Sequence, residues 1–145
     1  MNTAENIRNA LQVLYKTYEN VNYLMSDCRA AAEDCGYFNA SDKFLRVKSD
    51  RITNAWLLND FILLFQQVSD PDCPSGNGWK EGPLYTLEIC LGVADDAEQL
   101  PTLFLSAFHY TTLDDWRAGC SPAEHWGFFD PVHQNGPFLV HQEGA

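Results

Sequence analysis

Residues 7–35 read IRNALQVLYKTYENVNYLMSDCRAAAEDC, and apolar side chains recur there at alternating steps of four and three positions. This spacing places them along one side of an α-helix. Asn2, three residues before Glu5, predicts the helix start, because its side chain can accept a backbone N–H from the first turn. Gly36 predicts the end, since glycine readily adopts the left-handed conformation that follows a last turn. We therefore expect one amphipathic helix at about residues 3–35, with a seam of Ile7, Leu11, Leu14, Tyr18, Val21, Met25, Cys28, Ala32 and Cys35.

This helix is long for the size of the chain. At 1.5 Å per residue it measures roughly 50 Å. The usual size scaling gives a compact domain of 145 residues a diameter of about 38 Å. About two turns should extend past the rest of the domain. Either the sheet beneath is elongated or the helix end packs against a second copy. The same spacing of apolar residues is found in helices of an ordinary core, so an ordinary core helix and a self-associating helix both stay open as interpretations.

Two later segments alternate apolar residues with others and predict β-strands, at residues 85–93 and 102–110. The connection ADDAEQLP between them predicts an antiparallel hairpin. If paired residue numbers sum to about 195, Leu87 faces Phe108 and Leu91 faces Phe104, which gives one aromatic face. The opposite face then carries Thr86, Glu88, Cys90, Leu105, Ala107 and His109.

Residues 56–68 are apolar on nearly every side and fit a helix about as well as a buried strand. We favour a strand at residues 60–69, because Phe, Ile and Val are enriched and the breaker-rich SDPDCPSGNGWKEGP follows. The sequence thus predicts an α+β fold in a single domain, residues 1–145. It comprises the long N-terminal helix, a connector at 36–52, an antiparallel sheet of three or more strands at about 56–110, and an irregular aromatic-rich tail at 111–145.

The net charge of −11 is unevenly distributed. Residues 1–51 hold seven acids and seven bases, whereas residues 52–145 hold thirteen acids against Lys80 and Arg117. Such a field disfavours direct binding of nucleic acid or anionic membrane and favours a basic protein surface. Candidate binding residues are Asp95, Asp96 and Glu98 on the hairpin connection, with Asp114 and Asp115 beyond the second hairpin strand.

Cysteine usage and the apolar segments predict a cytoplasmic protein. The five cysteines are odd in number and form no CxxC pair, as expected in a reducing compartment. The N-terminal residues lack the apolar region of a secretory signal, and the longest apolar run, residues 61–65, is too short to span a membrane.

One set of residues has the outline of a catalytic site. The register above makes Glu88 and His109 diagonal neighbours on one face, and Cys90 adds a thiol to form a Cys-His-acid set. A semi-exposed histidine with a purely structural role explains the same pattern.

A second cluster, Cys120, His125 and His133 with His141 further on, holds the types of residue that bind transition metals. Its spacings match no zinc pattern, and the surrounding aromatic residues explain the order of this region equally well. The sequence contains no GxSxG, Walker A or GxGxxG motif, so we expect no cofactor.

Three functional hypotheses follow. The first is a non-catalytic interaction module whose acidic sheet half meets a basic protein surface, with self-association through the helix as an added expectation. The second is a nucleic-acid mimic that inhibits a DNA-binding protein, which would need rows of carboxylates where this chain has single acids and pairs. The third is a small enzyme that uses Glu88, Cys90 and His109.

Overall fold

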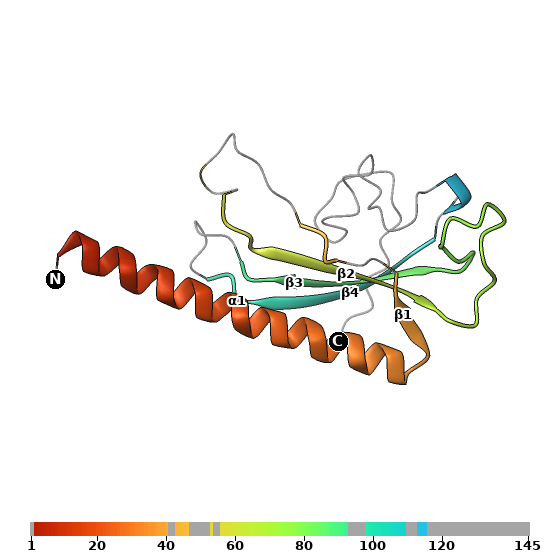
Figure 1. Cartoon of the computed structure of the whole chain (residues 1–145), viewed down its shortest axis with the longest axis horizontal. Helices are drawn as coiled ribbons and strands as arrows, with labels where there is room; N and C mark the ends of the chain where they lie inside the picture. Colours follow the sequence, from red (N-terminus) through yellow and green to blue (C-terminus); the bar gives the residue numbers. More distant parts are fainter. Residues whose placement is uncertain are drawn as a thin grey trace.

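One long helix and an antiparallel sheet form the described part of the chain. The computed structural model describes residues 2–40, 43–46, 53, 56–92, 98–109 and 113–115. The sheet has the strand order β1-β2-β3-β4 (Figure 1). The predicted α+β class is confirmed, whereas the tail predicted for residues 111–145 lies outside the described residues apart from 113–115. The elements are α1 (Thr3–Asp34), β1 (Tyr37–Asn39), β2 (Asp60–Gln67), β3 (Leu84–Cys90), β4 (Thr102–Phe108) and the 3₁₀ turn η2 (Leu113–Asp115).

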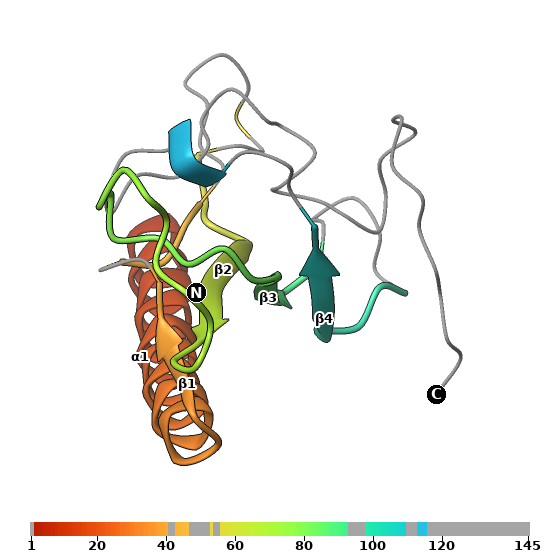
Figure 2. The ribbon, with the colours of Figure 1, turned by 90° about the vertical axis from the view of Figure 1, so that its right-hand side faces the viewer.

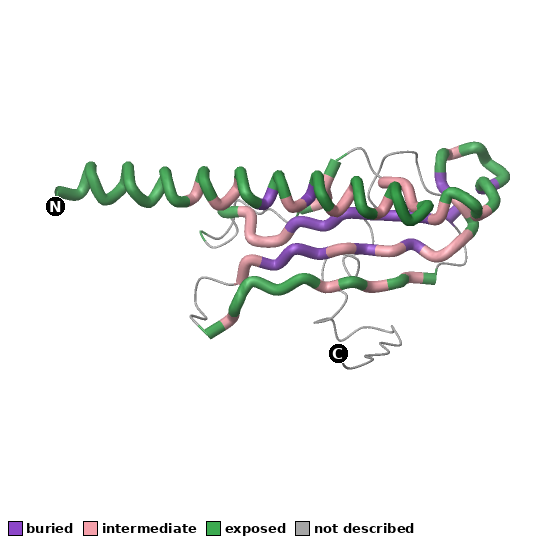
Figure 3. Tube along the Cα trace, turned by 90° about the horizontal axis from the view of Figure 1, so that it is seen from below, coloured by how far each residue is buried: buried purple, intermediate pink, exposed green. Residues whose placement is uncertain are grey.

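Both ends of α1 lie where the sequence predicts them. The backbone N–H of Glu5 donates to Asn2 Oδ1 at 2.8 Å, and Gly36 adopts a left-handed φ of 84° after the last turn. The helix packs on the sheet from Tyr18 onward, where Val21 and Met25 are buried. Residues 3–13 are all exposed, and Figure 3 shows these turns projecting past the end of the sheet. The expected overhang is therefore present.

The strand β2 is buried on both of its faces. Residues 61–66 are consecutively buried, with Phe61, Leu63 and Phe65 packed toward α1. Ile62 and Leu64 pack on the opposite side, in a cluster with Cys73, Trp79, Leu84 and Leu113. A strand between two layers has no reason to alternate, which explains why the sequence was ambiguous here. The strand prediction for this segment is confirmed, and the helical alternative is wrong.

The connector predicted for residues 36–52 contains a short strand that was not predicted from the sequence. β1 pairs with the end of β2, Tyr37 opposite Gln67 and Asn39 opposite Phe65. Leu45 forms a further isolated bridge with Ile62. Three residues are too few to show a periodicity of two, so only the pairing itself reveals this strand.

The hairpin of β3 and β4 is confirmed, but its predicted register is wrong. Leu84 pairs with Phe108 and Cys90 with Thr102, so the residue numbers sum to 192 instead of about 195. An odd shift exchanges the two faces of β4 relative to β3. The half-buried Phe104 and Phe108 therefore lie on the side away from α1, where Phe108 packs on the Trp79 cluster. Leu103, Leu105 and Ala107 are turned to the helix side.

The anchoring of α1 predicts a clear contrast between two truncations in one helix. Met25→Ala should destabilise the protein by about 2–5 kcal/mol, because it leaves a cavity between helix and sheet. Tyr15→Ala, at a position that is 67% exposed, should change stability by less than about 0.5 kcal/mol. Urea denaturation followed by circular dichroism measures both. Equal losses for the two variants would contradict this description of the helix–sheet contact.

Candidate functional site

The helix-side face of the sheet is only partly covered. Seen along the helix axis in Figure 2, α1 lies at the β1 and β2 side of the sheet, while β4 lies at the opposite edge. Four strands spaced about 4.8 Å apart make a sheet roughly 19 Å wide, and one helix about 10 Å in diameter covers half of it. Leu103 and Leu105 on this side of β4 are 53% and 76% exposed. No other described part of the chain covers the remaining half of this face.

A groove of about 320 Å³ lies between α1 and the uncovered strands. One wall is the flank of the helix, and the floor is formed by the end of β3 and the start of β4. We call this feature the open groove, and Leu105 continues its floor along β4. Most of the lining is apolar, which suits the side of an amphipathic segment better than a small polar substrate. The lining residues are Thr17, Asn20, Val21, Leu24, Ile89, Leu91, Pro101, Thr102 and Leu103.

The open groove was not predicted from the sequence. One signal for it exists in TLFLSAF, the sequence of β4, where apolar residues occupy both faces although the strand lies at a sheet edge. An edge strand with two apolar faces needs a cover on each side or a partner.

The predicted catalytic set is not brought together. Glu88 is buried opposite Phe104, and Cys90 lies opposite Thr102 on the same face. The exposed His109 follows Phe108, whose partner in β3 lies four residues, or about 13 Å, from Glu88. The register that made Glu88 and His109 neighbours is the one corrected above, so their proximity is lost with it.

Cys90 also lacks the chemistry of a nucleophile. Burial raises the pKa of its thiol to about 11, and a hydrogen bond with Asp60 adds to the shift. Burial likewise raises the pKa of Cys73. A catalytic cysteine needs the opposite shift, since the thiolate is the reactive form.

The predicted binding acids separate into two groups. Asp95 and Asp96 lie outside the described residues. Glu98 is exposed shortly before β4 begins, and Asp114 is exposed beyond its end in η2. Asp115 also belongs to η2. The described acids therefore do not form one patch.

Asp114 has an internal role. Its Oδ1 accepts the backbone N–H of Ser75 at 2.7 Å, and its backbone carbonyl accepts the Ser75 hydroxyl at 3.0 Å. Asn77 Nδ2 donates to the carbonyl of Leu113 at 2.8 Å. These contacts fasten η2 to the loop between β2 and β3.

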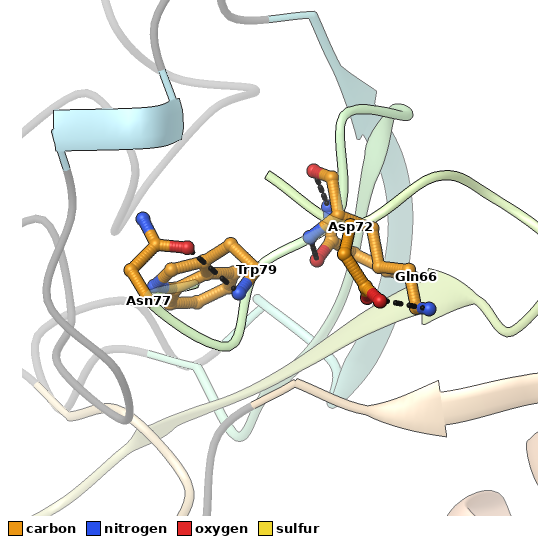
Figure 4. A network of polar contacts seen from close by, with 5 residues as sticks. Gln66, Asp72, Asn77 and Trp79 are labelled. Carbon is orange, nitrogen blue, oxygen red and sulfur yellow. Dashed lines mark hydrogen bonds and ion pairs between the residues drawn. The ribbon is translucent and has the colours of Figure 1, made fainter. Parts of the chain in front are cut away.

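Polar residues of that loop hold its own conformation, as Figure 4 shows. The amide of Gln66, fully buried in β2, donates to the carbonyl of Lys80 at 2.9 Å and accepts its backbone N–H at 2.9 Å. Lys80 Nζ lies 2.9 Å from Asp72 Oδ1, and the backbone N–H of Trp79 donates to Asn77 Oδ1 at 3.0 Å. The loop thus seats Trp79 in the core, and its lysine is engaged within the protein.

The metal candidates Cys120, His125, His133 and His141 lie outside the described residues. Within the parts of the chain that the structure covers, no three His, Cys, Asp or Glu side chains are grouped to hold a metal ion. The same parts contain no helix with the length and apolarity needed to span a membrane.

Comparisons with protein-family models, curated proteins and solved structures find no match to this chain. A functional proposal therefore depends on the geometry of the open groove and the charges around it.

Thiol labelling distinguishes a structural Cys90 from a catalytic one. With a pKa of about 11, roughly one thiol in ten thousand is ionised at pH 7, and we expect Cys90 to stay unlabelled by iodoacetamide in the native protein. The exposed Cys35 should react in the same sample, and peptide mass spectrometry resolves the two. Labelling of Cys90 ahead of Cys35 would restore the enzyme hypothesis.

Asp114 can be tested with a matched pair of substitutions. Asp114→Ala removes the acceptor for Ser75 and should cost about 1 kcal/mol of stability. Asp114→Asn keeps an acceptor oxygen and should cost less than half as much. Chemical denaturation measures both variants. If the asparagine variant is as unstable as the alanine variant, the charge rather than the hydrogen bond is what matters.

Proposed function

We propose that this protein is a non-catalytic protein-interaction module and that the open groove, with the helix-side face of β4, is its binding surface. The single observation that carries this proposal is the exposure of Leu103 and Leu105 beside the groove. Contiguous apolar surface of this kind is typical of sites where another protein or segment docks. The open groove runs beside a helix, and this shape suits an elongated apolar segment.

The surrounding charge indicates the nature of the partner. Residues 52–145 carry thirteen acids and two bases, and Lys80 is already paired with Asp72. We expect a partner with an apolar stripe flanked by basic residues, because complementary charge speeds association and selects the orientation. Direct nucleic-acid binding is disfavoured by the same charge.

A cytoplasmic location belongs to this proposal. Cys28, Cys35, Cys73 and Cys90 all carry free thiols, as expected for a protein in a reducing compartment. Neither the mimic nor the enzyme hypothesis gains a comparable observation, since Asp114 is bonded to Ser75 and the catalytic set is not assembled.

Affinity capture tests the proposal. Leu103→Ser with Leu105→Ser should abolish capture of partners that wild-type protein retains, because the apolar floor of the site is lost. Val68→Ser, in the turn after β2 where the side chain is 57% exposed, is the matched control and should capture them normally. Raising the salt concentration from 50 to 500 mM should slow association about tenfold or more. Identical capture by both variants would refute the site.

A further inference from the structure

We infer that the open groove is filled by the overhang of α1, residues 3–13, from a second copy of this chain in a reciprocal two-fold dimer. The inference rests on the proposed function, because it names the partner of the same surface. Each copy would supply one overhang and one groove, so a single symmetric contact would cover both.

The overhang carries an apolar stripe that nothing described in its own chain covers. Ile7 and Leu11 are 56% and 44% exposed. They continue the seam that, at Val21 and Met25, packs on the sheet. Because the steps of four and three persist, these side chains point to the same side as the buried part of the seam. Beyond the end of its own sheet, the helix therefore presents apolar residues on its sheet-facing side, where the sheet of a second copy would contact them.

The sizes of the two surfaces agree. Residues 3–13 of the helix span about 16 Å, and the seven residues of β4 span about 23 Å. The uncovered half of the sheet is one helix diameter wide. An overhang that enters antiparallel to α1 would lie along its Thr17, Asn20 and Leu24 flank and place its apolar side chains over Leu91 and Leu103.

The area is also sufficient. The overhang contributes eleven residues and the open groove nine, so at most twenty residues of each copy would take part in the contact, and Val21 and Ile89 among them are already buried. Specific interfaces usually contain about 20–30 residues on each side. One contact without its symmetry mate would involve only half of this surface, which favours the reciprocal arrangement.

Charge selects the antiparallel orientation. The overhang carries Arg8 against Glu5, a balance of 0, and Lys16 just beyond it pairs with Glu19 of its own chain. Residues 17–34 carry four acids against Arg29, a balance of −3. An antiparallel pair of helices places the neutral overhang of each beside the acidic part of the other, and the two helix dipoles then run in opposite directions, which is favourable. A parallel pair would place the acidic parts side by side.

Light scattering on the full chain tests the dimer with two variants that change exposed residues. The wild type should have a mass of about 33 kDa, twice 16.4 kDa. Ile7→Glu with Leu11→Glu (the overhang variant) and Leu103→Glu with Leu105→Glu (the groove variant) should each weaken dimerisation about a hundredfold, because each places charges in an apolar contact. Tyr15→Glu, on the flank away from the groove, should stay dimeric. Far-UV circular dichroism verifies that all the variants are folded.

Mixing the two variants gives the decisive result. A mixed dimer keeps one intact contact, between the unaltered overhang of the groove variant and the unaltered groove of the overhang variant. The mixture should therefore dimerise more tightly than either variant alone and less tightly than the wild type, which has two intact contacts. A dimer built by pairing two β4 edges or two overhangs would show no such rescue. Absence of rescue, or a monomeric wild type at 100 μM, would overturn the inference.

The outcome also separates this inference from the proposed function. If the wild type is monomeric while the groove variant still loses captured partners, the groove binds another protein and only the dimer is wrong. If the wild type is monomeric and the groove variant captures every wild-type partner, both proposals fail.

Discussion

The double-sided burial of β2 is the constraint on which the rest of the structure depends. Six consecutive residues, 61–66, are at most 6% exposed, so the strand requires an apolar layer on each face. α1 supplies one layer, and the loop that seats Trp79 supplies part of the other. Gln66 ends this run, and a buried amide without partners would be costly. The backbone C=O and N–H of Lys80 form hydrogen bonds with the amide nitrogen and oxygen of Gln66, and these bonds fix the loop to the strand.

The uncovered surface follows from connectivity. Cys35 and Gly36 alone separate α1 from β1, so the end of the helix is tied to the edge of the sheet that β1 forms. From that edge the helix reaches Phe61, Leu63 and Ile89 but leaves Leu103 and Leu105 exposed. A longer connection would allow the helix to centre itself over the sheet. The open groove is thus a consequence of a two-residue link.

Local patterns predicted the helix, both of its ends, its overhang, the strand at residues 60–69 and the hairpin, because each depends on neighbours in sequence. The misses depend on tertiary context. β1 is recognisable only through its pairing with β2. The register of β4 could not be derived because Leu103 and Phe104 are both apolar, so alternation did not say which face is buried. The Glu88 and His109 site depended on that register and was lost with it, and the groove could not be foreseen without the position of α1.

The formal charge of −11 overstates the acidic surface that a partner can meet. Glu88 is buried, Asp72 pairs with Lys80, and Asp114 holds Ser75. Exposed ion pairs each contribute about 0–1 kcal/mol, whereas full burial of one leucine contributes about 1.5–3 kcal/mol. Because Leu103 and Leu105 retain most of their exposed area, the affinity of the open groove for the proposed partner should come mainly from its apolar floor. In the proposed complex the acids would govern the rate, the orientation and the salt dependence of binding, which is the division of roles that electrostatic complementarity usually shows.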